Sequence, residues 1–378
     1  MVHVFVVNEN TLKHHLEYMF AGTGAGDKTS NFLICSNEIT THSTTERNLV
    51  GMIADISRIK INDKIIFYVQ GTTKFYGVFK AVSKVFFDEN DSDNYLADKL
   101  KKGLSFRIKI APYEVYSNGI TEHELLDMLY QKEHPSQLCW SLIYRKLKGN
   151  RGCTMIFDYE YADIIRKLKV ANNGISLNGN NFTYDKKTQL IIPITDINTY
   201  QGRMNSIDIK KRMLFKANRG NAFEVHLQAY ILQNFDTEPL RSIIYSIPEN
   251  KAIWIGNEVS CGVGMQRIDL MSIQESHNTI YIKVIELKCI PAYADIVHKQ
   301  LPWYIQWISD YVAPNYNKQV KITPCVLALE NNDNNQFIAD TQTFQPNIIG
   351  LQPNVSIEPI EYYEFSVDTD SISFNKIL

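Results

Sequence analysis

The chain has 378 residues and a mass of 43.5 kDa, a length that predicts two or three domains. Its formal net charge of −2 excludes a strongly basic chain. Apolar residues make up 44% and charged residues 21% of it, values typical of a globular protein with real cores. No apolar run reaches membrane-spanning length, no secretory leader is recognisable, and the six cysteines are widely spaced without a C-x-x-C pair. We therefore expect a cytoplasmic protein without a membrane partner, a disulfide framework or a zinc site.

The first part of the chain is rich in short strands. Hydrophobic patterning predicts strands over residues 2–7, 61–69, 75–82 and 104–112, and helices over residues 12–20 and 158–168. Short strands interleaved with helices are typical of a small mixed β-barrel. This predicts an N-terminal domain over residues 1–170, then an Asn- and Gly-rich linker over residues 171–200 in which residues 183–194 are compatible with a hairpin.

Three stretches of this domain carry a recognisable pattern. They are Asn62-Asp63-Lys64-Ile65-Ile66-Phe67-Tyr68, Phe75-Tyr76-Gly77-Val78-Phe79 and Arg107-Ile108-Lys109-Ile110-Ala111-Pro112. The pattern resembles the PUA-like superfamily, in particular its EVE and YTH domains, which implies a reader that flips a modified base and holds it between aromatic side chains. The residues expected at such a base pocket are Trp140, Ser36, Asn37 and Tyr76. An aromatic residue in a small barrel is more often part of its core.

Basic residues gather in two places where a DNA backbone would lie. One cluster comprises Arg145, Lys148 and Arg151, and the other comprises Lys210, Lys211 and Arg212. Both clusters would suit phosphate groups. Each is equally compatible with an ordinary solvent-exposed helix surface.

The region from residue 201 to residue 378 mixes helical and strand patterns. We expect a helix over residues 221–231 and strands over residues 253–256, 267–270, 281–287 and 320–329. This order predicts an α/β domain with a mixed sheet. Alternating apolar residues after Leu351 indicate strands that extend the sheet or form an interface.

Two acids and a lysine stand out in this C-terminal domain. Asp269 lies on the opposite face of its strand from the flanking apolar residues, while Glu286 and Lys288 end an apolar strand and share one face. The two carboxylates and the carbonyl of Leu287 would hold a divalent cation, and Lys288 would orient water or neutralise charge on a phosphate. Taken alone, Glu286 and Lys288 are also compatible with a simple ion pair at a strand end.

A helix bearing Gln300-Leu301-Pro302-Trp303-Tyr304 follows these strands. The joint pattern resembles the PD-(D/E)XK nuclease superfamily over about residues 204–334, in particular its branch of archaeal mismatch endonucleases and Mrr-like restriction enzymes. The resemblance implies catalytic roles for Asp269, Glu286, Lys288, Gln300, Tyr304 and Glu224, with the metal held by Asp269, Glu286 and Glu224. Pro302 departs from the pattern and leaves the direction of Gln300 open. Glu224 is also compatible with a plain surface glutamate.

Together the two resemblances imply a metal-dependent DNA endonuclease in which the N-terminal domain reads a modified base and the C-terminal domain cuts, as in modification-dependent restriction. Two other interpretations remain open, namely a repair endonuclease for mismatched or branched DNA and a non-catalytic nucleic-acid-binding protein. The expected cofactor is Mg²⁺ or Mn²⁺, with no nucleotide cofactor. The expected partners are DNA and a second copy in a homodimer, since cutting both strands requires two active sites.

Overall fold

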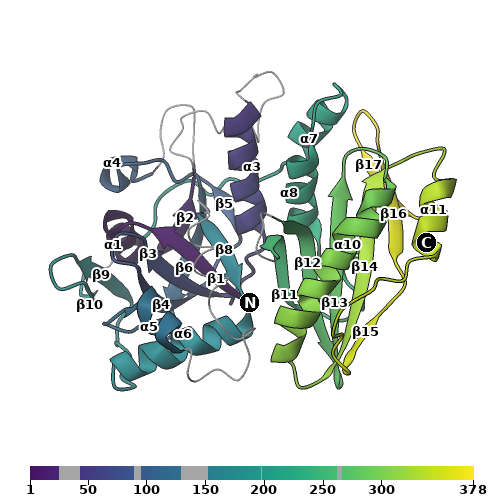
Figure 1. The fold of residues 1–378 in the computed structure, drawn as a ribbon. Coiled ribbons are helices and arrows are strands. Elements are labelled where there is room, and N and C mark those ends of the chain that lie inside the picture. Colours follow the sequence, from purple (N-terminus) through teal and green to yellow (C-terminus); the bar gives the residue numbers. More distant parts are fainter. Residues whose placement is uncertain (25–42, 89–94, 129–151, 197, 262–265) are drawn as a thin grey trace. The chain divides into compact units, whose positions relative to one another are not determined.

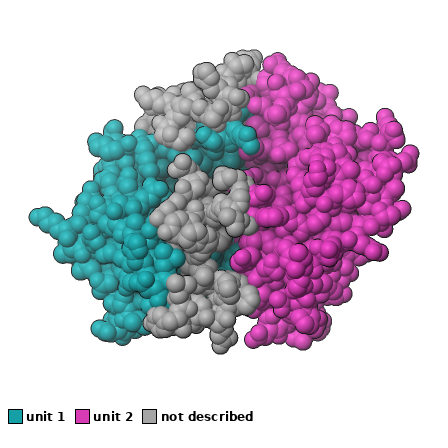
Figure 2. Space-filling view, in the orientation of Figure 1, with its two compact units in different colours: residues 1–133, 138–208 teal, residues 134–137, 209–378 magenta. Residues whose placement is uncertain are grey.

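The computed structural model describes residues 1–24, 43–88, 95–128, 152–196, 198–261 and 266–378 (Figure 1). These residues form two compact units, the first ending at Asp208 and the second starting at Ile209, which are coloured teal and magenta in Figure 2. Six residues named above lie outside the described ranges: Ser36, Asn37, Trp140, Arg145, Lys148 and Arg151.

The first unit is built on a curled, half-barrel sheet. Its strand order is β2 (Phe20–Thr23), β6 (Phe106–Pro112), β4 (Lys74–Ala81), β3 (Lys64–Val69), β1 (Val2–Val7) and β8 (Cys153–Ile156). β1 and β3 are parallel and the other neighbours are antiparallel. Two short strands lie beside this path, β5 (Phe86–Phe87) on β6 and β7 (Ile120–Thr121) on β4. The four strands expected in this region are confirmed, and their sheet is mixed.

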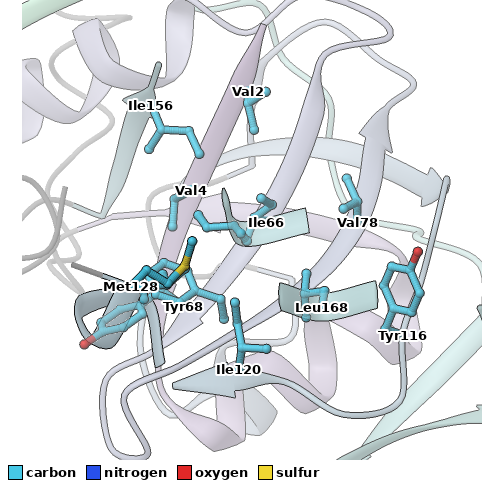
Figure 3. Packing of buried hydrophobic residues seen from close by; sticks show 13 residues of the cluster. Val2, Val4, Ile66, Tyr68, Val78, Tyr116, Ile120, Met128, Ile156 and Leu168 are labelled. Carbon is cyan, nitrogen blue, oxygen red and sulfur yellow. The ribbon is translucent and has the colours of Figure 1, made fainter. Parts of the chain in front are cut away.

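The core of this unit lies between the sheet and α6 (Asp158–Ala171). Val2 and Val4 of β1 alternate along the strand and point to the same side as Ile66 of β3 (Figure 3). They join one buried cluster with Ile164 and Leu168, which are one turn apart on α6. The short α5 (Glu122–Leu126) adds a further buried side chain to the cluster.

The helix expected over residues 12–20 is α1 (Glu9–Tyr18), and it starts earlier than its apolar pattern. Asn8 Oδ1 accepts a hydrogen bond from the Thr11 N–H at 2.8 Å, and Thr11 Oγ1 accepts one from the Asn8 N–H at 3.0 Å. This reciprocal pair satisfies amide donors at the start of the helix. The described part of the unit also contains the helices α3 (Ser43–Ser57) and α4 (Ala97–Leu100).

Residues 171–200, expected to be a linker, belong to the first unit. The segment contains the antiparallel hairpin of β9 (Asn181–Asp185) and β10 (Leu190–Ile194). Phe182 and Tyr184 of this hairpin are buried and pack edge-on against Phe79 and Tyr76. Burial of these aromatic rings holds the segment to the sheet, although its surroundings in the sequence are polar.

The second unit contains a mixed sheet, as expected. Its strand order is β11 (Ala252–Ser260), β12 (Arg267–Ser276), β13 (Thr279–Lys288), β14 (Gln319–Leu329), β16 (Glu361–Val367) and β17 (Ile372–Lys376), with β15 (Val355–Ile357) also on β14. β14 runs parallel to β13, β15 and β16, whereas the other neighbours are antiparallel. The strands expected over residues 253–256, 267–270, 281–287 and 320–329 are confirmed.

The α-helices described in the second unit are α7 (Lys210–Ala217), α8 (Glu224–Asn234), α9 (Leu240–Ile244), α10 (Leu301–Trp307) and α11 (Asn335–Gln342). α10 lies in front of the sheet in Figure 1 and belongs to the connection between β13 and β14. A π-helical segment, Ile296–Gln300, precedes it, and Pro302 lies in the first turn of α10. The change of helical type accommodates a residue that has no N–H to donate. Within the described ranges, no helix combines the length and apolar character needed to cross a membrane.

Candidate functional site

Asp269 and Glu286 lie opposite each other where β12 and β13 separate. The antiparallel ladder between these strands ends at Leu270 and Ile285, so Asp269 and Glu286 occupy the next cross-strand position. Beyond it, β12 stays paired with β11, and β13 stays paired with β14 as far as Lys288. The two acids therefore stand at the point where the sheet opens.

Leu287 presents both of its backbone polar groups to this opening. Its N–H donates to Asp269 Oδ2 at 2.8 Å, and its carbonyl accepts from Lys288 Nζ at 3.1 Å. These groups would bond to β12 if the ladder continued. The Leu287 carbonyl, expected from the sequence to be a metal ligand, thus points at the site.

Glu286 is 2% exposed, and both of its carboxyl oxygens accept hydrogen bonds. Lys288 Nζ lies 2.5 Å from Oε1, and the Tyr304 hydroxyl lies 3.0 Å from Oε2. The same hydroxyl lies 3.0 Å from the carbonyl of Arg267. Tyr304 therefore connects α10 to the ends of both strands that carry the acids.

The pKa values of these groups follow from burial and from their mutual charge. Burial first, and then the charge of Glu286, hold the pKa of Asp269 well above its usual range. Burial also raises the pKa of Glu286, although the hydrogen bonds from Lys288 and Tyr304 oppose that rise. Burial lowers the pKa of Lys288, but the carboxyls of Glu286 and Asp269 raise that pKa by more. The net change is upward, so Lys288 stays protonated. Ionisation of both carboxyls is therefore unfavourable, even with the Lys288 ammonium beside them. An additional positive charge would stabilise the site.

Glu224 and Gln228 lie one turn apart on α8. Glu224 is exposed, and its charge makes a smaller contribution than burial and Glu286 to the raised pKa of Asp269. Gln228 is buried; its Nε2 donates to the Asp269 carbonyl at 3.0 Å, and its Oε1 accepts from Asn257 at 3.2 Å. Gln228 thus fixes the backbone at Asp269. Gln228 was not expected at the site, because its only signal in the sequence is its helical spacing from Glu224.

Gln300 precedes Tyr304 by four residues, which places both on one side of the helix. Its Oε1 is buried and has no hydrogen-bond partner among the described residues. A buried amide oxygen without a partner is energetically costly. This atom is suited to accept a hydrogen bond from a ligand or from metal-bound water.

The residues at the opening fit a hard divalent cation in donor type and in charge. Asp269 and Glu286 supply carboxylate oxygens and Leu287 a carbonyl oxygen, the ligands that Mg²⁺ and Mn²⁺ prefer. Within the described part of the chain, no three His, Cys, Asp or Glu side chains come close enough to hold a metal by themselves. Water and substrate phosphate would therefore complete the coordination, as is common for Mg²⁺.

Tyr76, expected at a base pocket, lies in the core of the first unit. Its side chain is fully buried, and its hydroxyl donates to the Gln189 carbonyl at 2.9 Å. Its ring packs edge-on against Tyr184. Because the hairpin β9–β10 covers it, Tyr76 has no free ring face for a base.

A different part of the first unit contains a cavity of about 200 Å³. Its lining includes His15 of α1, Thr23 of β2, Gln70 after β3, and Lys102. His15 is fully buried between the rings of Phe20 and Phe67, and neither ring nitrogen makes a hydrogen bond of normal geometry within the described residues. Burial and the nearby charges of Arg107 and Lys102 hold the pKa of His15 well below its usual range, so the imidazole is neutral.

The basic segment at α7 is not a continuous phosphate-binding surface. Lys211 is exposed and Lys210 is half-buried, but Arg212 is only 4% exposed and lies over the ring of Phe215, 5.0 Å from its centroid. Arg212 was expected to contact DNA. It faces the packed side of the helix instead, next to the buried Met213.

No protein-family model matches the chain, and no curated protein matches it. Among solved structures, the crystal structure of protein PSPTO5229 from Pseudomonas syringae aligns with 44% of this chain and 99% of its own, at 12% sequence identity and a TM-score of 0.26. At that TM-score the likeness carries no argument about fold or function.

Proposed function

We propose that the protein is a metal-dependent endodeoxyribonuclease whose second unit hydrolyses phosphodiester bonds. The observation that supports this most is the convergence of Asp269, Glu286 and Lys288 where β12 and β13 separate, with the pKa values of both carboxyls raised. Perturbed acids beside a fixed cation are typical of functional sites. An ordinary ion pair at a strand end would involve Glu286 and Lys288 without the second acid.

Each residue of the site has a defined role in this proposal. Asp269, Glu286 and the Leu287 carbonyl would hold Mg²⁺ or Mn²⁺, which supplies an activated water and charge at the phosphate. The Lys288 ammonium neutralises the negative charge that develops on the phosphate. The Tyr304 hydroxyl orients Glu286, Gln300 Oε1 accepts a hydrogen bond from bound water, and Glu224 adds negative charge at the rim.

The cavity of the first unit supports a role in reading DNA. A cavity of about 150 Å³ is large enough for one benzene ring, so the cavity of about 200 Å³ beside His15 has room for a single flipped base. His15 lines this cavity, and its imidazole would form a hydrogen bond with the edge of that base. The protein would thus be a modification-dependent restriction enzyme, acting on DNA as a homodimer because cutting both strands requires two sites.

Cleavage of matched DNA duplexes tests the proposal. Unmodified duplexes and duplexes with 5-methylcytosine, 5-hydroxymethylcytosine or N6-methyladenine would be incubated with Mg²⁺ or with a chelator. We expect metal-dependent cutting of one modified duplex, a loss of more than about 100-fold in rate for Asp269→Asn, and loss of the preference for modified DNA in His15→Leu.

Other outcomes would point elsewhere. Metal-dependent cutting of mismatched or flapped duplexes, without any effect of base modification, would favour a repair endonuclease and remove the reader role from the first unit. Retained DNA binding without cleavage of any substrate would favour a non-catalytic nucleic-acid-binding protein. An Asp269→Asn variant as active as the wild type would eliminate the proposed site.

A further inference from the structure

Lys288 bonds the same oxygen atoms that the proposed function assigns to a metal. Its Nζ lies 2.5 Å from Glu286 Oε1 and 3.1 Å from the Leu287 carbonyl oxygen. The side chain of Lys288 is 14% exposed and that of Glu286 is 3% exposed. The ammonium is therefore enclosed at the site and is the counter-charge nearest to Glu286.

A divalent cation bound to these two oxygens would take nearly the same place as the ammonium. Mg²⁺ and Ca²⁺ sit about 2.0–2.6 Å from their oxygen ligands, and the ammonium is already at 2.5 Å from Glu286 Oε1. Both cations would then lie within a few ångströms of each other in a buried environment, where like charges repel strongly. Binding of both cations at Glu286 Oε1 and the Leu287 carbonyl is therefore unfavourable.

The site has more carboxyl groups than cations, which makes such an exchange favourable. The site contains two carboxyls and one ammonium. The Asp269 carboxyl accepts a hydrogen bond from the Leu287 N–H and not from Lys288. The exposed Glu224 is a third acidic residue, one that contributes to the raised pKa of Asp269. A dication neutralises more of this charge than a lysine does.

We propose that Lys288 is the resident cation of the metal-free site, and that metal binding displaces its ammonium from Glu286 and Leu287. This inference rests on the proposed function and adds that the Lys288 ammonium and the metal compete for the same oxygen atoms. The displaced ammonium, still tethered to the end of β13, becomes available to the substrate phosphate. Glu286 thereby has a counter-charge in the absence of metal, and the lysine is released for the substrate only when metal has bound.

The test measures Mn²⁺ affinity in the absence of DNA, by calorimetry and by the electron paramagnetic resonance signal of free Mn²⁺ at pH 8. Wild-type protein would be compared with Lys288→Met and with Lys288→Gln, which keeps a hydrogen-bond donor without the charge. Arg267→Met is the matched control, because Arg267 is a cation two residues from Asp269 that pairs with Glu258 at 3.1 Å and not with Glu286. Thermal denaturation of each variant verifies that it is folded.

Removing a charge-assisted hydrogen bond that competes with the metal is expected to tighten Mn²⁺ binding about tenfold or more in both Lys288 variants. Arg267→Met is expected to change it less than about threefold. Unchanged or weaker binding by both Lys288 variants would overturn the competition, and so would equal tightening by Arg267→Met, which would indicate only the general field of a nearby cation. Absence of Mn²⁺ binding in every protein would overturn the proposed metal site itself, and the inference with it.

Discussion

The properties of Asp269 and Glu286 follow from their position at the point where β12 and β13 separate. Each acid lies where the pairing between β12 and β13 stops, although β12 remains paired with β11 and β13 with β14. Asp269 accepts a hydrogen bond from the Leu287 amide, and Glu286 accepts hydrogen bonds from Lys288 and Tyr304. Burial raises the pKa of both carboxyls. At the scale of single residues, the site therefore stores a destabilising charge that a ligand can relieve.

This stored charge predicts how stability depends on pH in the metal-free protein. The unfolded chain loses the Asp269 proton near pH 3.9, whereas the raised pKa of the folded protein keeps it to higher pH. The stabilisation from this residue is thus complete below about pH 4 and is lost as the pH rises from there through the raised pKa. Asp269→Asn removes the titration and keeps an oxygen for the Leu287 amide.

We expect Asp269→Asn to melt about 2–8 °C above the wild type at pH 8 without metal, and at nearly the same temperature at pH 4. Asp295→Asn, an exposed acid paired with Lys299, is the control and is expected to shift stability by less than about 0.5 kcal/mol. Thermal denaturation at a series of pH values measures both. Equal melting temperatures of Asp269→Asn and the wild type at pH 8 would contradict the stored charge.

At the scale of elements, the packing of α6 stabilises the half-barrel sheet of the first unit. Its buried residues Ile164 and Leu168 recur at four-residue spacing and belong to one buried cluster with alternate residues of β1 and β3. A helix with one apolar face and a strand with one apolar face can bury both surfaces only by packing together. Such a contact concentrates stability in a few side chains.

Leu168→Ala is expected to cost about 2–5 kcal/mol in the stability of this unit, because it leaves a cavity in the cluster. Val170→Ala on the same helix is the control, since Val170 is 71% exposed, and is expected to cost less than about 0.5 kcal/mol. Hydrogen exchange of the β1 and β3 amides measures the effect within this unit, because a chain of two units need not unfold in one step. Similar exchange rates in the two variants would show that α6 does not support the sheet.

At the scale of the whole molecule, the chain divides into units between Asp208 and Ile209. The hairpin β9–β10 belongs to the first unit through the burial of Phe182 and Tyr184. A net charge of −2 over the chain means that binding to DNA would depend on local contacts rather than on the overall field.

This division predicts the behaviour of two fragments. Residues 1–208 are expected to melt cooperatively, whereas residues 1–170 would expose the rings of Phe79 and Tyr76 that the hairpin covers, and would melt at a lower temperature or aggregate. Circular dichroism during heating and size-exclusion chromatography measure the difference. Identical melting of the two fragments would mean that the hairpin is dispensable to this unit.

The sequence by itself determined the strand, turn and strand that carry Asp269, Glu286 and Lys288. Residue alternation along β12 and β13 is local, and a short turn leaves antiparallel pairing as the simplest arrangement, so the acids could be placed near each other without a structure. The mixed sheet and most strands followed from the same periodicity. Pattern alone also suggested the helix of Tyr304, whose contact with Glu286 the structure then provided.

Only the tertiary structure decided which polar and aromatic residues are buried by elements distant in sequence. Tyr76 has the pattern of a base-binding residue, but the hairpin β9–β10, more than a hundred residues later, covers it. Arg212 reads as a DNA contact, yet it lies on the packed side of α7. The cavity beside His15 combines residues of several elements, and no local spacing indicates it. Burial depends on long-range packing, which periodicity along the chain does not specify.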